Sequence, residues 1–546
     1  MPYVVTRSCC ADASCVLACP VNCIHPAPGE PGFGTTEMLY VDPRTCVDCG
    51  ACVTACPVDA LKPHTALAAA ELPFLELNRA YYDTHPHEDR TPMALVPPQR
   101  RIRRGELRVA VVGAGPAGLF AADELLRHPG VSVTVHDRLP TPYGLARAGV
   151  APDHQDTKQV TGLFRAIESQ PGFTYRLNTH IGRDLHHEDL LRDHHAVLYA
   201  VGAATDRRLG IEGEDLPGCA SATDFVAWYN GHPDHSADTF PLDGERAVVV
   251  GNGNVALDVA RVLTADPERL ARTDISDRAL DALRASRVRE VVVLGRRGPA
   301  EAAFTLPELL AAAALDDIDV LVEGWPADVP ADATPSTRVL AEIAARPRRP
   351  GSRRLVLRFL TAPARVVGDD RVTGLTVVRT ALRTRSGTVE AVPTGDEETL
   401  GAPLVLRAVG YRARPVPGLP FDEDTGTVPH ERGRVSPGVY VAGWIKRGPT
   451  GFIGTNKSCA QETVEALLDD WDAGRLADPA APAAGRPAPP DTVGLDGWRA
   501  IDASERAAGL AEDRPRVKLV DRERLLAAAR TPAPSGPGAA GGGRWK

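Results

Sequence analysis

The chain has 546 residues with a net charge of −9, and 43% of its side chains are hydrophobic. At about 100–200 residues per domain, this length predicts three or four compact units. The acidic balance argues against a generic nucleic-acid-binding protein, which usually has a strongly basic domain. No apolar run is long enough for a membrane helix, and the N-terminus lacks the pattern of a signal peptide. We therefore expect a cytoplasmic protein without membrane insertion.

Cysteine is concentrated at the N-terminus, where the first 56 positions hold all but two of the 11 cysteines. In a reducing compartment, such clustering indicates metal ligands or redox groups rather than disulfides. The last four of these cysteines have the spacing C-x2-C-x2-C-x3-C-P of bacterial ferredoxins, in which the fourth cysteine binds the other of two clusters. This spacing predicts iron–sulphur ligands at Cys46, Cys49, Cys52 and Cys56.

The same spacing, counted back from the first Cys-Pro pair, places an earlier copy of the motif at residues 9–20. In this copy Asp12 stands where a second thiolate would be expected. The predicted metal ligands are therefore Cys9, Cys15 and Cys56 for one cluster, and Cys19, Cys46, Cys49 and Cys52 for a second cluster of the 4Fe-4S type.

The aspartate leaves two forms open for the first cluster. It is either a three-iron centre or a four-iron cube whose labile iron is held by Asp12 or by water, and a carboxylate would hold that iron weakly. Cys10 is an alternative ligand, whereas Cys23 is interpreted as a buried thiol that binds no metal. Residues 1–65 resemble the two-cluster bacterial ferredoxins, especially the seven-iron type. The resemblance implies an α+β fold and one-electron transfer.

After a Pro- and His-rich segment, the stretch LRVAVVGAGPAGLFAADELLRH predicts a buried strand, a glycine turn and a helix. Gly113 permits the tight turn, Gly115 lets the backbone approach a pyrophosphate, and Gly118 allows close packing of the helix. Asp137 follows the next strand and can accept hydrogen bonds from ribose hydroxyls, which argues against a 2′-phosphate. This first site therefore suits FAD or NAD.

A second fingerprint, GNGNVA, begins at Gly251 and again follows a predicted strand. The next strand of this unit ends in Arg296 and Arg297 instead of an acidic residue. Two guanidiniums at that position fit a 2′-phosphate, which a carboxylate would repel. The second site therefore favours NADP(H) over NAD(H).

Two similar strands, AVLYAVGAATDRR and LVLRAVGYRAR, are interpreted as paired crossings between the two dinucleotide domains. The NADP domain would then be inserted into the FAD domain, and both would be doubly wound α/β folds. The predicted units are a ferredoxin domain at 1–65, a linker at 66–106, a FAD-binding domain at 107–205 and 405–480, an NADP-binding domain at 206–404, and a partly flexible extension at 481–546.

Five segments carry a closer resemblance: GAGPAG, LPTPYGLARAGVAPDH, GNGNVALDVAR, GRRGPAEAAFTLPEL and GWIKRGPTGFIGTNK. They resemble the adrenodoxin reductase type of ferredoxin–NADP reductase, an α/β flavoprotein with two dinucleotide sites, over about residues 107–465. The whole chain resembles the ferredoxin-fused bacterial form. The FAD residues implied by this resemblance are Gly113, Gly115, Ala117, Gly118, Asp137, Leu145, Thr179, Trp444, Gly451, Phe452 and Ile453. The implied NADP residues are Arg207, Asn252, Gly253, Asn254, Val255, Arg296, Arg297 and Glu308, with Gly451 close to the nicotinamide.

The resemblance implies an NADPH:ferredoxin oxidoreductase that passes a hydride from NADPH to FAD and then single electrons to iron–sulphur clusters. His154 is a candidate proton shuttle near the flavin, or else a structural residue of its loop. The alternative function is an electron-input subunit similar to the glutamate synthase small subunit. The basic runs 100–104 and 346–354 could attract an acidic ferredoxin as partner, although solvated loop charge explains the second run equally well.

Overall fold

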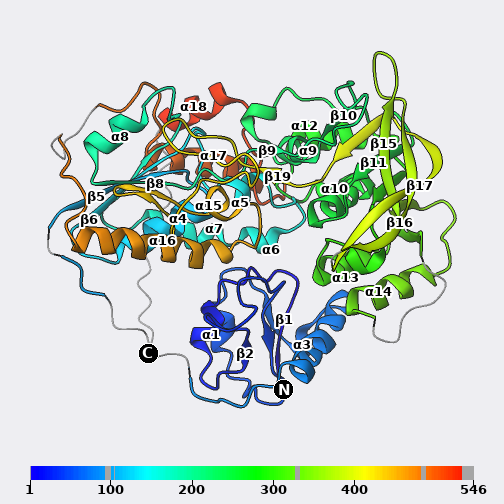
Figure 1. Ribbon diagram of the computed structural model, residues 1–546, viewed down its shortest axis with the longest axis horizontal. Helices are drawn as coiled ribbons and strands as arrows, with labels where there is room; N and C mark the ends of the chain where they lie inside the picture. Colours follow the sequence, from blue (N-terminus) through cyan, green and yellow to red (C-terminus); the bar gives the residue numbers. More distant parts are fainter. Residues whose placement is uncertain are drawn as a thin grey trace.

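The computed structural model describes residues 2–92, 100–103, 105–325, 333–385, 387–480 and 487–531. A small N-terminal domain lies beneath two larger α/β domains, which stand side by side (Figure 1). This arrangement confirms the predicted fold class, in which an α+β ferredoxin domain precedes a two-dinucleotide flavoprotein. None of the described helices is long and apolar enough to cross a membrane.

The ferredoxin domain consists of two short antiparallel ribbons and three helices. Its first two helices have five residues each, and both end immediately before the cysteine of a Cys-Pro pair. The elements are β1 (Tyr3–Val5) paired with β4 (Leu61–Pro63), β2 (Ile24–His25) paired with β3 (Tyr40–Val41), α1 (Ser14–Ala18), α2 (Ala51–Ala55) and α3 (Leu72–Thr84).

Helix α3 corrects the prediction that 66–106 is only a linker. The Asn78 amide on this helix donates to the carbonyl of Val5 and accepts from the N–H groups of Val5 and Val41. Tyr82 donates its hydroxyl to the carbonyl of Tyr40 at 2.7 Å. Because Asn78 satisfies backbone groups of β1 and β3, α3 is part of the ferredoxin domain.

The FAD domain is built on a six-stranded sheet in the order β20-β21-β8-β5-β6-β7, parallel except for its edge strand β20. Helices cover both faces, as expected for a doubly wound fold. Its strands are β5 (Leu107–Val112), β6 (Val131–His136), β7 (Phe173–Arg176), β8 (Ala196–Tyr199), β20 (Arg434–Ser436) and β21 (Val439–Val441). Its helices are α4 (Pro116–Leu126), α5 (Gly144–Ala148), α6 (Gln155–Lys158), α7 (Thr161–Glu168), α8 (His187–Asp193), α15 (Trp444–Arg447) and α16 (Thr455–Asp472).

The NADP domain has a second six-stranded sheet, parallel throughout, and a three-stranded antiparallel sheet of β15, β16 and β17 beside it. The strands are β10 (Cys219–Ser221), β11 (Arg246–Val250), β12 (Glu290–Leu294), β13 (Ile318–Glu323), β14 (Arg353–Arg358), β15 (Thr361–Val367), β16 (Gly374–Arg385), β17 (Thr388–Gly401) and β18 (Leu404–Arg407). The helices are α9 (Ala222–Tyr229), α10 (Asn254–Thr264), α11 (Pro267–Leu270), α12 (Asp277–Arg284), α13 (Leu306–Ala313) and α14 (Pro335–Ala344).

The crossing between the two domains is a small antiparallel ribbon of β9 (Thr205–Asp206) and β19 (Tyr411–Arg412). Strand β18 precedes this ribbon and lies between β10 and β11 in the NADP sheet. The predicted boundary at 404 is therefore several residues too early, because the NADP domain continues to β19.

The C-terminal extension forms α17 (Leu495–Ala511) and α18 (Arg522–Arg530), which pack against the FAD domain (Figure 1). Trp498 is 1% exposed and lies in the core of that domain, with its indole N–H 3.4 Å from the hydroxyl of Tyr143. The extension also reaches the NADP domain, where Lys518 binds Asp274 at 2.9 Å. Residues 487–531 are thus a folded part of the extension, which was expected to be only partly flexible, whereas 481–486 and 532–546 lie outside the described residues.

Candidate active site and metal centres

The first glycine turn is shaped so that only glycine fits at two of its positions. Gly113 has a φ of +112°, and a Cβ there would lie 2.4 Å from the carbonyl oxygen of Ala200. A Cβ at Gly118 would lie 1.9 Å from the carbonyl oxygen of Gly113. Helix α4 begins directly after Gly115, so its free N–H groups face the turn, as a pyrophosphate site requires.

Asp137 lies against this turn at the end of β6. Its two carboxylate oxygens accept from the N–H groups of Ala114 and Leu139 at 2.8 and 2.9 Å. Burial raises the pKa of Asp137, although these two N–H groups lower it. A carboxylate has about four acceptor positions, so two remain for ribose hydroxyls.

The structure brings Leu145 and Thr179 to opposite sides of the same region. Leu145 lies on α5, whose Gly144 backbone meets that of Gly115, and its side chain is 38% exposed. Thr179 is buried, donates its N–H to the carbonyl of Asp137 at 2.8 Å and meets the C-terminal extension through its hydroxyl. Leu145 thus remains accessible, whereas Thr179 supports the Asp137 loop.

The segment from Gly443 to the start of α16 lies against the first glycine turn, where the resemblance implies the flavin. A Cβ at Gly443 would lie 2.6 Å from Cβ of Ala117, so this segment touches the first turn of α4. The indole N–H of Trp444 donates to the carbonyl of Thr450. Gly451 has a φ of +81°, which turns the chain so that Phe452 and Ile453 precede the N-terminus of α16.

Arg447 lies in this segment and was not among the residues predicted from the sequence. One of its terminal nitrogens donates to the carbonyl of Thr450 and to the side-chain oxygen of Asn456. Its Nε and its other terminal nitrogen are buried and lack a partner among the described residues. These free donors give the site a further anion- or carbonyl-binding group, and the only sequence signal was its place in GWIKRGPTG.

The second glycine turn repeats the geometry of the first. Gly251 also has a φ of +112°, and a Cβ there would lie 2.3 Å from the carbonyl oxygen of Ala408. The Cβ position of Gly253 faces open space, and α10 begins with Asn254, followed by Val255. Asn252 packs against the backbone at the end of β12. The predicted NADP fingerprint is therefore a formed cradle.

Arg296 and Arg297 follow β12, as the sequence predicts. Arg296 is exposed and Arg297 is half-buried, and neither guanidinium has an ion-pair partner in the part of the chain that the structure describes. Arg207 is exposed at the β9–β19 crossing. Two unpaired guanidiniums at the end of this strand suit a phosphate dianion.

His154 and Glu308 meet where all three domains join. Nε2 of His154 accepts from a terminal nitrogen of Arg261 at 2.7 Å and contacts Arg7 of the ferredoxin domain. Desolvation by burial, Arg261 and Arg7 lower the pKa of His154 well below its usual value. His154 is therefore a neutral acceptor held by two guanidiniums, which argues against its donating a proton from Nε2. The same two guanidiniums also neutralise neighbouring carboxylates, since Arg261 pairs with Asp258 and Arg7 pairs with Glu308.

The four predicted ligands of the second cluster surround one cavity. Its lining includes Cys19, Cys46, Cys49 and Cys52, of which Cys49 is exposed. Cys23 is also part of the lining, 3.4 Å from the sulphur of Cys19, although it was predicted to be a bystander. A convergence of thiols around a cavity fits a cubic iron–sulphur cluster.

Cys9, Cys15 and Cys56 gather near Asp12 on the side that faces the flavoprotein. Burial raises the pKa of each thiol and Asp12 raises it further, and neighbouring sulphurs add to the rise at Cys9 and Cys15. The carboxylate of Asp12 accepts from Ser14 and lies 3.6 Å from the ammonium group of Lys457 on α16. The neighbouring Cys10 packs against the core of the FAD domain.

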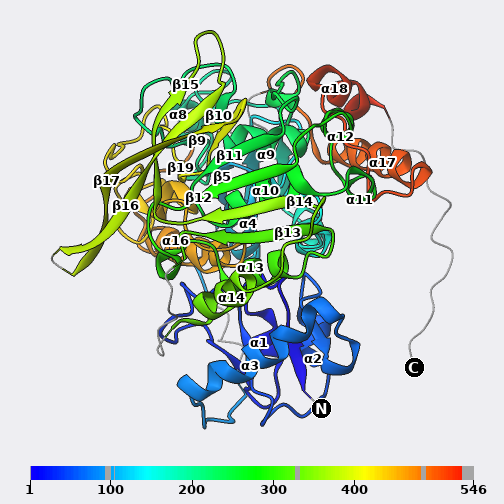
Figure 2. The same cartoon turned by 90° about the vertical axis from the view of Figure 1, so that its right-hand side faces the viewer.

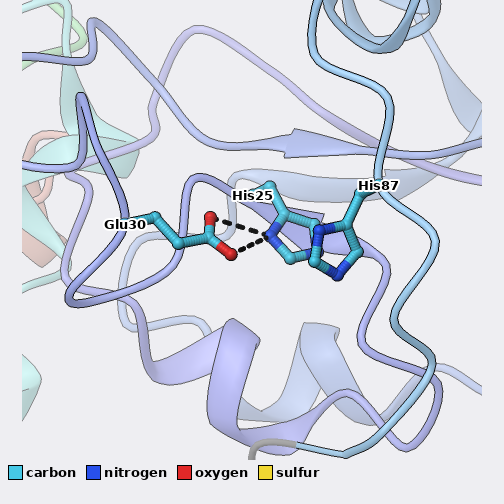
Figure 3. Close-up of side chains that lie close together, drawn as sticks. All are labelled: His25, Glu30 and His87. Carbon is cyan, nitrogen blue, oxygen red and sulfur yellow. Dashed lines mark hydrogen bonds and ion pairs between the residues drawn. The ribbon is translucent and has the colours of Figure 1, made fainter.

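A further group of possible ligands, His25, Glu30 and His87, lies elsewhere in the ferredoxin domain (Figure 3). Both carboxylate oxygens of Glu30 lie 3.0 Å from Nδ1 of His25. Although burial opposes it, bonds from Ala27 N–H and His25 lower the pKa of Glu30. The amide of Asn22 donates to Nε2 of His87, and the ring centroids of His25 and His87 are 3.7 Å apart with the planes tilted by 38°. This geometry fits a hydrogen-bonded brace between two loops better than a metal site.

The ferredoxin domain docks directly on the segment from Gly443 to the start of α16. The N–H of Gly454 donates to the carbonyl of Cys10 at 2.8 Å. A Cβ at Gly454 would lie 2.3 Å from the backbone nitrogen of Asp12, so no larger residue fits without displacing the domain. The predicted Asp12-side cluster residues therefore lie beside the N-terminus of α16.

Comparisons with known proteins agree with this geometry. Residues 107–290 match the pyridine nucleotide-disulphide oxidoreductase family, and residues 39–62 match the 4Fe-4S binding domain family. The "Probable ferredoxin/ferredoxin--NADP reductase" of Mycobacterium tuberculosis is 53% identical over 98% of this chain and 96% of its own length. This chain belongs to the ferredoxin–NADP reductase family. The NADPH:adrenodoxin oxidoreductase of Arabidopsis thaliana is 40% identical over 78% of this chain and 95% of its own.

The reductase part also resembles a solved structure. Mycobacterium tuberculosis FprA in complex with NADPH matches with a TM-score of 0.73 and 44% identity, over 78% of this chain and 100% of that chain. The predicted resemblance is confirmed, and the family together with the 4Fe-4S match supports FAD, NADP(H) and at least one iron–sulphur cluster as cofactors. An input subunit similar to the glutamate synthase small subunit is not favoured, because reductases match nearly the whole chain.

Proposed function

We propose that this protein is an NADPH:ferredoxin oxidoreductase that carries its own ferredoxin. When bound, FAD would take a hydride from NADPH and release single electrons to iron–sulphur clusters. The proposal rests mainly on one contact, in which the N–H of Gly454 donates to the carbonyl of Cys10. This contact holds the ferredoxin domain, a one-electron acceptor, against the segment 443–454, where we propose that the flavin binds.

The side chains of the site fit binding and orientation rather than acid–base chemistry. The two glycine turns hold the dinucleotides, Arg296 and Arg297 bind the 2′-phosphate, and the N-terminus of α16 stabilises negative charge on the flavin. His154 accepts hydrogen bonds from Arg7 and Arg261, so we assign it the positioning of this junction. Proximity and orientation are what hydride transfer requires of the protein.

For the metal centres, we propose a 4Fe-4S cluster in the cavity lined by Cys19, Cys46, Cys49 and Cys52. The Asp12 side would hold a three-iron centre, because the carboxylate of Asp12 is already bound by Ser14 and Lys457. Electron paramagnetic resonance of the isolated protein tests this assignment. An oxidised three-iron centre gives a signal, whereas a silent spectrum with eight irons per chain would overturn it.

The external partner is proposed to be an acidic ferredoxin or a similar one-electron acceptor protein. Of the arginines expected to attract it, Arg100 binds Asp469 at 2.8 Å, and Arg103 lies over the ring of Trp471. In the run 346–354, Arg354 pairs with Glu290, whereas the guanidiniums of Arg346 and Arg349 donate only to backbone carbonyls and keep their charge unpaired among the described residues. We propose this run as the docking surface. We keep a cytoplasmic location in the proposal because none of the eleven cysteines, all of which lie in the described residues, forms a disulphide.

Anaerobic titration with NADPH tests the function. We expect NADPH to bleach the visible flavin band of the holoprotein and then to reduce the clusters, which electron paramagnetic resonance detects. If dithionite bleaches the flavin and NADPH does not, the proposed function is wrong.

A further inference from the structure

The ferredoxin domain binds residues 305–308 of the NADP domain. This short segment also contacts the NADP fingerprint. On one side, the side-chain oxygen of Asn254 accepts from the N–H of Thr305 at 2.8 Å. On the other side, Glu308 is bound by Arg7 of the ferredoxin domain. Helix α13, which begins in this segment, lies between the NADP sheet and the ferredoxin domain (Figure 2).

The contact between Arg7 and Glu308 is bidentate. Nε of Arg7 donates to one carboxylate oxygen at 3.2 Å, and a terminal nitrogen donates to the other at 2.7 Å. The two side chains are only 26% and 16% exposed, so solvent screens the pair less than a surface pair. A bidentate pair fixes the orientation of the carboxylate and still leaves lone pairs for a ribose hydroxyl.

A second side chain of the ferredoxin domain holds the same segment. The carboxylate of Glu37 accepts from the N–H of Leu306 at 2.9 Å, in the first turn of α13, where an acceptor is favourable. Leu310, one turn further on, packs against the core of the ferredoxin domain. Side chains of the ferredoxin domain therefore hold both the carboxylate of Glu308 and the first turn of α13.

The local charge also depends on Arg7. Arg7 and Arg261 face three carboxylates at this junction, those of Asp153, Asp258 and Glu308. Without Arg7, one guanidinium would face all three. The added negative charge would oppose an anionic dinucleotide.

We propose that Arg7 is a positioning residue for NADP(H). It sets Glu308 in the orientation that the bound dinucleotide uses, so docking of the ferredoxin domain and binding of NADP(H) favour one another. The inference rests on the proposed function and on the assignment of Glu308 to the NADP site, which the sequence resemblance implies. Since linkage is reciprocal, docking tightens NADP(H) binding by the same factor by which NADP(H) tightens docking.

Calorimetric titration of the full-length holoprotein with NADP+ tests whether Arg7 strengthens NADP(H) binding. We expect Arg7→Ala to weaken binding about 5–10-fold, near the lower end of measured couplings, and Arg7→Lys to weaken it less. Glu308→Gln should also weaken binding, and adding Arg7→Ala to it should cause no further loss. The matched control is Arg44→Ala, which removes an exposed arginine of the same domain and should leave affinity within about twofold.

Hydrogen exchange at the Gly454 amide tests whether NADP(H) binding strengthens docking of the ferredoxin domain. This amide reports docking because it donates to the Cys10 carbonyl. NADP+ should slow its exchange in the wild type and not in Arg7→Ala. Three results would each overturn the inference. They are an NADP+ affinity of Arg7→Ala equal to that of the wild type, losses of affinity in Arg7→Ala and Glu308→Gln that multiply in the double variant, and a rate of exchange at the wild-type Gly454 amide that NADP+ does not change. A wild type that fails to bind NADP+ would instead overturn the proposed function.

Discussion

The two arginines after β12 give a sharp prediction about the choice between NADPH and NADH. Arg297 is half-buried and Arg296 is exposed, so their bonds to a 2′-phosphate should differ in strength. A charge-assisted hydrogen bond contributes about 2 kcal/mol at a half-buried site, and an exposed pair contributes about 1 kcal/mol or less. Arg297→Ala should then lower kcat/KM for NADPH about 30-fold and Arg296→Ala about fivefold.

The measurement is the initial rate of ferricyanide reduction with each nucleotide. Because NADH has no 2′-phosphate, kcat/KM for NADH should change less than about twofold in both variants. Arg269→Ala removes an exposed arginine of the same domain that pairs with Asp317, and it should leave both values unchanged. An equal fall with NADPH and NADH would refute the assignment, because it would show that the arginines support the domain rather than the phosphate.

Three further predictions concern stability and metal content. Trp498→Ala should lower the free energy of unfolding by about 3–5 kcal/mol in urea denaturation, because it empties a buried site, whereas Leu510→Ala at an exposed site should change little. Burial alone would raise the pKa of Asp274, but two lysine ammonium groups hold it below its usual value. Asp274→Asn should therefore destabilise the protein by about 3 kcal/mol at pH 7, and this difference should narrow below about pH 4, where the unfolded carboxyl takes up a proton. Cys46→Ser should lose the iron of one cluster while Cys23→Ser keeps all of it, and equal iron in the two variants would contradict the ligand assignment.

The sequence was sufficient wherever a local pattern has a single physical use. Gly113 and Gly251, the first glycines of the two fingerprints, are required by a positive φ and by a backbone contact under 2.5 Å, so they mark strand-turn-helix units without any tertiary information. The cysteine spacing is equally specific, because three closely spaced thiolates can bind one cluster while the fourth, before the proline, binds the other. For the same reason Arg296 and Arg297, adjacent to a predicted strand, lie where the sequence places them.

The sequence could not predict the place of an element in the fold where a single polar side chain, rather than a periodic hydrophobic pattern, determines that place. Helix α3 belongs to the ferredoxin domain because the Asn78 amide satisfies backbone groups of two strands, and one asparagine carries no periodic signal. Strand β18 resembles β8 in sequence, so its residues alone could not show that it joins the other sheet. Nothing in the sequence of the extension indicated that Trp498 would pack against Tyr143 in the core of the FAD domain.

Contacts across the domain interfaces were the hardest to anticipate. Arg7 and Glu308 lie 301 positions apart, and neither has a neighbour in sequence that indicates the pair. His154 was singled out from its motif, yet its partners Arg7 and Arg261 come from two other domains. The chemistry assigned to it therefore changed once its surroundings were known, because a guanidinium on Nε2 leaves no proton there to donate.

Both ends of the chain bridge the two dinucleotide domains, and this has a consequence for catalysis. The ferredoxin domain contacts α16 of one domain and α13 of the other, while the extension joins the FAD domain through Glu505 and Arg147 and the NADP domain through Lys518 and Asp274. Hydride transfer requires reacting atoms about 3–3.5 Å apart, so small rotations between the domains would slow it. Two separate bridges oppose such rotations better than one, because a single contact can act as a pivot. Substitutions at either bridge should therefore slow flavin reduction even though they lie outside both nucleotide sites.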